Sequence, residues 1–276
     1  MSLLKATLTN SASRVFGKVA SKKFPSLIQL GINKLYTSVT GVDLSMFHPH
    51  GHYETLNALF TRELRFKRDI SKDPKSIISP ADSLISALGE IEASDALQIK
   101  GFAYNIRELL TKHISNTQIE KMIGGQFINF YLSPMDYHRY HVPMDMKVLK
   151  AVHVPGLLYP VNFKYLKKVP SLFVKNERVI LECQDVNEKL FYVILVGALN
   201  VGKMTLSFDA RIETNIDASE IKVYEYEETY LKKGEELGMF MMGSTIVMLF
   251  ERDYIDLLEE KLGKSVRFGD VIASKH

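Results

Sequence analysis

The sequence predicts an α+β protein whose sheets are mainly antiparallel, with amphipathic helices at the N-terminal end. From Gln126 onward, short runs rich in β-branched and apolar residues follow one another. Few of these runs are separated by a helix long enough for the crossover that joins parallel strands. Residues 1–45 instead carry apolar residues at helical spacing. We therefore expect basic amphipathic helices over residues 1–45 and the main domain over residues 46–276.

Size and composition are those of a folded protein with a substantial core. The chain has 276 residues, 46% of them hydrophobic and 24% charged, which suits one large domain or two small ones. Its single cysteine, Cys183, excludes an internal disulfide and is typical of a reducing compartment. The longest apolar runs, residues 191–196 and 246–250, are too short to cross a bilayer. We expect no membrane-spanning helix.

Positive charge is concentrated in the N-terminal arm, residues 1–45. No acidic residue precedes Asp43, whereas six basic residues do: Lys5, Arg14, Lys18, Lys22, Lys23 and Lys34. Without these six, the 35 basic residues of the chain fall to 29, against 32 acidic ones. The arm therefore accounts for the formal net charge of +3.

Apolar residues in the arm form two helical stripes, split by Pro25. They are Leu4, Leu8, Val15, Phe16 and Val19, followed by Leu27, Ile28, Leu30, Ile32 and Leu35. Two basic amphipathic segments suit the surface of an anionic membrane, where each lysine or arginine contributes about 1 kcal/mol. The alternative is a pair of ordinary core-packing helices with a solvated basic face.

The stretch from Tyr53 to Gly125 mixes helical patterns and turns. Residues 53–64 show helical spacing, and the basic patch that follows is most simply a solvated face; it comprises Arg62, Arg65, Lys67 and Arg68. Residues 79–83 predict a turn into an alternating strand over residues 84–91, and Asp82 alone is most simply a turn carboxylate. A helix is expected over residues 105–123.

The second half of the chain predicts a series of strands. They are expected over residues 127–132, 147–154, 178–182, 191–198, 203–208 and 244–250, with a final helical pattern over residues 257–262. The run that begins at Ser244 is apolar and β-branched enough to be a fully buried strand.

Residues 133–143 hold the densest cluster of titratable groups in the chain. His138 and His141 lie close to Asp136 and Arg139, between two prolines. Metal binding has little support, because no third ligand sits at a suitable spacing. Either histidine alone could belong to a core or a turn. Together they favour a functional site, because histidine is the usual general base near neutral pH.

Gly243 and Ser244, at the entry to the buried strand, permit two interpretations. The simpler is a turn leading into a strand. In the other, the Ser244 hydroxyl attacks the Gly243 carbonyl and replaces the peptide bond by an ester. Elimination across Cα–Cβ of Ser244 then cuts the chain, and hydrolysis leaves a pyruvoyl group, an electron sink that needs no bound cofactor. The short motif alone does not choose between them.

Six motifs, taken in order, resemble the phosphatidylserine decarboxylase family. They are Ser-Pro-Ala-Asp at 79–82, Asp-Tyr-His-Arg-Tyr-His-Val-Pro at 136–143, Pro-Val-Asn at 160–162, Leu-Phe-Val-Lys-Asn-Glu-Arg-Val at 172–179, Val-Gly-Ala at 196–198 and Met-Gly-Ser-Thr-Ile-Val at 242–247. The resemblance spans nearly everything after about residue 50, and it is to the prokaryotic type, in which basic N-terminal helices sit on the membrane. One departure is Ser83, where the family usually has glycine.

The resemblance implies a self-cleaving precursor. Ser244 would be the nucleophile, His141 the base that takes its proton and Asp82 the carboxylate that orients His141. Cleavage between Gly243 and Ser244 would give chains 1–243 and 244–276, which stay packed together. The pyruvoyl group derived from Ser244 would form a Schiff base with the amine of phosphatidylserine, and the product would be phosphatidylethanolamine. His138 would assist decarboxylation or deliver the proton.

The same resemblance implies a peripheral protein on the cytoplasmic face of the cell membrane. Its partners would be the lipid substrate and an anionic bilayer, with no nucleic acid and no metal, and a homo-oligomer stays open. Two alternatives remain. One is a soluble pyruvoyl-dependent decarboxylase of a free amino acid, against which the basic arm argues. The other is a lipid-binding homologue that is never processed, against which the presence of Asp82, His141, Gly243 and Ser244 argues.

Overall fold

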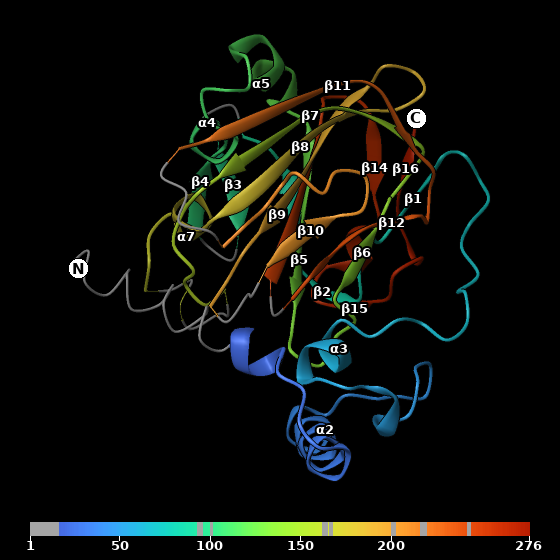
Figure 1. Cartoon of the computed structure of the whole chain (residues 1–276). Coiled ribbons are helices and arrows are strands. Elements are labelled where there is room, and N and C mark those ends of the chain that lie inside the picture. Colours follow the sequence, from blue (N-terminus) through green and yellow to red (C-terminus); the bar gives the residue numbers. More distant parts are fainter. Residues whose placement is uncertain are drawn as a thin grey trace.

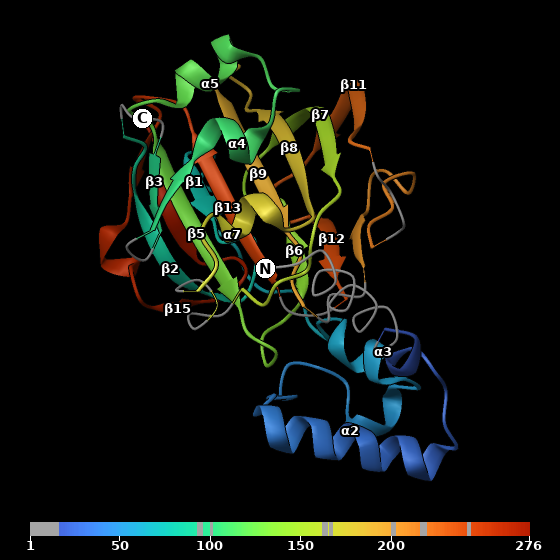
Figure 2. The same ribbon diagram turned by 90° about the vertical axis from the view of Figure 1, so that its left-hand side faces the viewer.

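The α+β class is confirmed by the computed structural model, which describes residues 17–92, 96–99, 102–161, 165, 168–199, 203–215, 220–241 and 244–276. Antiparallel sheets form the body, and the N-terminal helices α2 (Ser26–Thr40) and α3 (Leu56–Phe60) lie below it (Figures 1 and 2). The largest sheet has eight strands in the order β11-β7-β8-β9-β13-β5-β2-β15. They are β2 (Ser83–Glu90), β5 (Gln126–Leu132), β7 (Met146–Val154), β8 (Arg178–Gln184), β9 (Leu190–Val196), β11 (Lys222–Leu231), β13 (Ser244–Phe250) and β15 (Ser265–Val266).

Strand β13 lies inside this sheet and begins at the residue that the sequence predicts. It pairs antiparallel with β5 on one side and with β9 on the other. All seven of its residues are buried, and each large apolar side chain buried in this way contributes roughly 1.5–3 kcal/mol. The segment that begins at Ser244 is therefore anchored in the middle of the core.

Three smaller sheets account for the other paired strands of the described residues. Their strands are β1 (Ser76–Ile78), β16 (Val271–Lys275) and β14 (Ile255–Leu257); β10 (Met204–Leu206), β12 (Glu236–Phe240) and β6 (Arg139–His141); and β3 (Ala96–Ile99) with β4 (Phe102–Asn105). The sheet that contains β6 and β12 joins the histidine cluster to the segment that leads toward Ser244.

Helices in the described residues include α2 (Ser26–Thr40), η1 (His50–His52), α3 (Leu56–Phe60), α4 (Ile106–Leu110), α5 (Asn116–Met122), α7 (Leu172–Lys175) and η2 (Glu259–Lys261). The helices in regions 53–64 and 105–123 are shorter than the periodic patterns predict. The helix expected over residues 105–123 divides into α4 and α5 because Thr111 has a φ of 68°, which a helix cannot contain, and because Ser115 forms a capping box that starts α5.

The final helix expected over residues 257–262 is wrong. Its beginning belongs to β14, which pairs with β16, and only the short 3-10 turn η2 follows. Backbone pairing with a neighbouring strand outweighs a weak local helical pattern here. The sequence pattern also missed β11, whose polar residues face solvent at the edge of the large sheet.

Helix α2 buries three of its polar residues and exposes four of its apolar ones. Gln29, Asn33 and Thr37 are buried, and the Asn33 amide donates to the carbonyls of His50 and Tyr53 at 2.9 Å each. The exposed large side chains of the helix are Leu27, Ile28, Leu35 and Val39, the first 82% exposed. Figure 2 shows α2 beneath the body, separated from the sheets by α3.

The first apolar stripe of the arm falls almost wholly on residues that the structure does not describe. Leu4, Leu8, Val15 and Phe16 lie outside the described residues, while Val19 is 54% exposed. Among the helices of the described ranges, none is long and apolar enough to cross a membrane.

Candidate active site

Ser244 occupies the first position of β13, opposite Leu132 of β5. Its side chain is completely buried, and its hydroxyl has no hydrogen-bond partner among the described residues. Gly243, the other half of the predicted cleavage site, lies outside those residues. A buried hydroxyl without a partner costs free energy and calls for an explanation, and reactivity is one.

The pairing of β6 with β12 places the two histidines at different distances along the chain from Ser244. The Phe240 N–H donates to the His138 carbonyl at 2.9 Å, whereas His141 lies opposite Glu236. His138 therefore sits beside the end of β12 that leads to Ser244. His141 sits beside its beginning.

His138 is a buried, neutral imidazole. Its Nδ1 lies 2.8 Å from the Asp136 carbonyl oxygen, and its ring centre lies 3.9 Å from that of Phe60. Burial lowers the pKa of His138 to about 3. Its Nε2 is also buried and has no hydrogen-bond partner in the described part of the chain. The ring thus carries a lone pair that is available to a reacting group.

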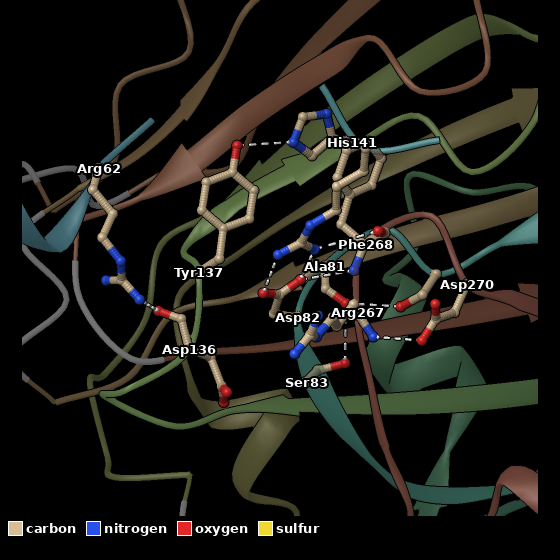
Figure 3. A network of polar contacts seen from close by, with 12 residues as sticks. Arg62, Ala81, Asp82, Ser83, Asp136, Tyr137, His141, Arg267, Phe268 and Asp270 are labelled. Atoms are coloured by element: carbon tan, nitrogen blue, oxygen red, sulfur yellow. Dashed lines mark hydrogen bonds and ion pairs between the residues drawn. The ribbon is translucent and has the colours of Figure 1, made fainter. Parts of the chain in front are cut away.

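His141 is enclosed on three sides (Figure 3). Its Nδ1 lies 3.1 Å from the Gly234 carbonyl oxygen, so the neutral ring carries its proton there, and the Tyr137 hydroxyl lies 3.1 Å from Nε2. The Phe268 ring stacks on it with centres 3.6 Å apart. Burial, more than any charge, lowers the pKa of His141 to about 4. At neutral pH it is a base whose lone pair is occupied by Tyr137.

Asp82 is held by Arg68. The Arg68 Nη1 pairs with Oδ1, and Nη2 lies 2.9 Å from Oδ2. The backbone N–H of Phe268 also donates to Oδ1, at 2.7 Å. Within the described residues, no hydrogen bond joins Asp82 to His141. The two predicted partners thus belong to one cluster, linked through Arg68 and Phe268, and the orienting role of Asp82 stays a prediction.

Ser83, the departure from the family pattern, fits its position. It begins β2, its side chain is buried and its φ is not positive. Because that backbone conformation is open to any residue, serine leaves the neighbouring Asp82 in place without strain.

The basic patch after α3 is a solvated face only in part. Arg65 and Lys67 are exposed, whereas Arg62 is only 2% exposed and Arg68 forms the ion pair with Asp82. Sequence reasoning missed Arg62 and Arg68, together with Tyr137 and Phe268, because an isolated basic or aromatic residue carries no signal of its distant partners. That these residues lie close to the histidine motif in the fold could not be predicted from the sequence.

A cavity of about 690 Å³ opens beside this cluster. Its wall includes His141, Tyr137, Arg68 and Phe268, with Lys67, Arg139 and Lys233 among the basic residues. Neither Ser244 nor His138 lines it. Over the described ranges, no group of three histidine, cysteine or acidic side chains is placed to hold a metal ion.

Comparison with known proteins supplies a family. The family model described as phosphatidylserine decarboxylase matches residues 56–274. Relatives called phosphatidylserine decarboxylase proenzyme include one from Helicobacter pylori (strain Shi470), 45% identical over 271 residues, which cover 98% of each chain. Another, from Campylobacter jejuni, is 43% identical over 97% of this chain and 99% of the relative. One from Coxiella burnetii (strain RSA 331) is 33% identical over 88% and 86%.

Proposed function

This chain belongs to the phosphatidylserine decarboxylase family, and on that premise we propose that it cuts itself at Ser244 and works through a pyruvoyl group formed there. It is the proenzyme of a carboxy-lyase that converts phosphatidylserine to phosphatidylethanolamine with loss of CO₂. The observation that carries the proposal is the Ser244 hydroxyl, buried at the start of β13 without a partner among the described residues.

The cleavage step balances within the chain. The Ser244 oxygen attacks the Gly243 carbonyl carbon and passes its proton to a base, so that an ester replaces the peptide bond. Removal of the Ser244 Cα proton then expels the Gly243 carboxylate and leaves dehydroalanine. Tautomerisation and hydrolysis release ammonia and give the pyruvoyl ketone. When present, that group would supply an electron sink for the electron pair that remains on the substrate Cα when CO₂ leaves.

For cleavage, we propose His141 as the base and Asp82 as its orienting carboxylate. The low pKa of His141 supports the first role, because the ring is neutral at physiological pH. In the described conformation Arg68 holds Asp82, and Tyr137 caps the lone pair of His141. Cleavage through this triad therefore requires both contacts to open.

For turnover, we propose His138. Its free Nε2 lone pair and its place beside the end of β12 nearest Ser244 support this role. A proton taken up at Nε2 can be handed to the substrate carbon that loses CO₂. The two histidines would thus divide cleavage and turnover between them.

We also propose that α2 lies on an anionic bilayer. The helix presents Leu27, Ile28, Leu35 and Val39 to solvent while its polar stripe is bonded inward. An exposed apolar face of this kind suits the boundary between lipid headgroups and acyl chains. Lys18, Lys22 and Lys34, all exposed, supply the charge that anionic headgroups attract.

After cleavage, chains 1–243 and 244–276 should stay together. Strand β13 is hydrogen-bonded on both sides to strands of the proposed large chain, and β16 pairs with β1 and β15 with β2. The new chain begins inside the core, so its separation would expose seven buried residues.

An intact-mass measurement combined with an activity assay tests the proposal. We expect two fragments that meet between Gly243 and Ser244, the smaller lacking an N-terminal amine, and CO₂ release from phosphatidylserine vesicles but not from free serine. Release from free serine alone would favour the soluble decarboxylase. A single uncut chain that binds vesicles would favour the unprocessed homologue.

A further inference from the structure

Arg62 carries a charge in an almost dry environment. It is 2% exposed and stacks over the Phe47 ring, with its Cζ 4.6 Å from the ring centre. No acidic side chain within the described residues forms an ion pair with it, and its Nε and Nη1 have no hydrogen-bond partners there. A buried charge without a counter-charge is costly. Its presence calls for a reason other than stability.

The hydrogen bonds of Arg62 all go to the loop that carries the histidines. Its Nη2 donates to the carbonyls of Met135 at 2.8 Å and Asp136 at 2.9 Å. The Asp136 carbonyl also accepts the Nδ1–H of His138 at 2.8 Å. Arg62 and His138 therefore share one acceptor, and Figure 3 shows Arg62 reaching it from the side opposite Tyr137.

This shared acceptor determines the tautomer of His138. A carbonyl oxygen can only accept, so the ring proton resides on Nδ1 and the lone pair on Nε2. The positive charge of Arg62 adds to burial in lowering the pKa of His138. The carboxylate of Asp136 is turned to the Ser133 N–H, at 2.6 Å.

The groups that contact His138 from α3 and β12 are uncharged, while the charged neighbour Arg139 is bonded to the segment before Arg62. Phe60 of α3 packs on the imidazole, and Phe240 of β12 bonds to its backbone. The Thr61 carbonyl accepts a hydrogen bond from Arg139 Nε at 3.0 Å. Residues 60–62 thus run along the loop and contact it at several successive positions.

We propose that Arg62 is a positioning residue for His138: it anchors the Asp136 carbonyl, which keeps the His138 proton on Nδ1 and leaves Nε2 free to exchange a proton with the substrate. The inference rests on the turnover role proposed for His138. Arg62 itself touches neither the substrate nor the reacting atoms.

The tautomer can be measured without activity. In the uncut Ser244→Ala protein, ¹⁵N chemical shifts at pH 7 should show His138 protonated on Nδ1. Arg62→Met should shift it toward a mixture with the Nε2–H form, whereas Arg65→Met should not, because the Arg65 guanidinium stacks on the neighbouring Phe66 instead. An unchanged tautomer in Arg62→Met would overturn the proposal.

Turnover supplies the second measurement. Mature Arg62→Met should still be cut but lose roughly tenfold or more in decarboxylation. The acidic limb of its pH–rate profile should move to higher pH. Loss of the cation raises the pKa of His138, so the neutral imidazole is protonated at a higher pH than in the parent. Arg62→Lys retains the charge but not the planar guanidinium, so its acidic limb should stay at the parental pH while its decarboxylation rate falls. This variant also replaces Arg62→Met if Arg62→Met does not fold.

The outcomes separate this inference from the proposed function. A variant that loses only thermal stability, with the parental tautomer and acid limb, would make Arg62 a purely structural residue. Parental turnover in His138→Ala would instead remove the role of the histidine, while the tautomer measurement would still decide whether Arg62 positions it.

Discussion

The Phe268 ring stacks on the His141 ring at 3.6 Å, only 11° from parallel. The backbone N–H of the same phenylalanine donates to Asp82 at 2.7 Å. Phe268 belongs to the proposed small chain, whereas His141 and Asp82 belong to the large one. The fragment that begins at Ser244 therefore also holds two of the groups proposed to release it.

The first prediction concerns maturation. Because Ser244 supplies the only hydroxyl at the proposed junction, Ser244→Ala should remain a single uncut chain on a denaturing gel and by intact mass. Thr245→Val, at the next position, should be cut like the parent. Two fragments from purified Ser244→Ala would contradict the mechanism.

The second prediction separates the histidines. His141→Ala should accumulate uncut precursor, since it lacks the proposed base. His138→Ala should be cut but should decarboxylate roughly 10²–10⁴-fold more slowly. Processing is read on a gel, and turnover as CO₂ released from phosphatidylserine vesicles. Equal processing defects in both variants would refute this division of roles.

The third prediction concerns the Arg68–Asp82 pair, whose side chains are 11% and 16% exposed. Arg68→Gln leaves a mostly buried carboxylate with its charge uncompensated. The free energy of unfolding should fall by roughly 3 kcal/mol, measured by urea denaturation on the uncut Ser244→Ala background. Asp82→Asn combined with Arg68→Gln should recover part of this loss. A double variant as unstable as the sum of both single ones would mean that the pair contributes no coupling.

The fourth prediction is a pH dependence of stability. Burial lowers the pKa of His141 from 6.5 to about 4. Between these values the unfolded chain binds a proton that the folded chain does not, so stability falls as pH falls, by up to about 1.4 kcal/mol per pH unit for one such group. On the uncut Ser244→Ala background, His141→Gln should reduce the urea-measured slope between pH 6.5 and 4 without abolishing it, because burial lowers the pKa of His138 as well. An unaltered slope would mean that His141 titrates normally.

The fifth prediction concerns the arm. Reversing Lys18, Lys22 and Lys23 to glutamate should weaken co-sedimentation with anionic liposomes and lower activity on lipid substrate. Self-cleavage should be unaffected, because its groups lie within the folded domain. Salt should screen the charge contribution over a Debye length of about 10 Å at 0.1 M.

The matched control for the arm is reversal of Lys112 and Lys121. Both are exposed, and they lie around α5, at the end of the body opposite α2 (Figure 1). These changes should leave binding intact. If the arm variant bound liposomes as well as the parent, the arm would be better explained as helices packed on the domain, and another surface would have to contact the membrane.

Much of the fold was predictable because burial leaves a local trace. The run from Ser244 is apolar on both faces since β13 is covered on both, and the structure begins and ends the strand where the pattern does. Edge strand β11 shows no such apolar pattern, because most of its side chains are exposed or partly exposed to solvent and can therefore be polar. The end of the chain was misjudged because β14 is defined by its partner β16.

Only those site residues that stand in recognisable motifs could be predicted from the sequence. Asp82, His138, His141 and Ser244 stand in short motifs with a chemical rationale. Arg68, which pairs with Asp82, and Arg62, which binds the loop before His138, do not. In the sequence, Arg62 looks like any other member of a basic surface patch. What distinguishes it is burial against a loop far along the chain, which only the tertiary structure shows.

The position of β13 between β5 and β9 affects how the mature enzyme can fail. Before the cut, unfolding is a unimolecular event that one chain can reverse. After a cut at the proposed junction, unfolding would release two molecules, and recovery would require them to find each other again, so apparent stability would depend on protein concentration. At low concentration, loss of the mature enzyme becomes practically one-way, and its lifetime is set by the rate at which β13 leaves the sheet.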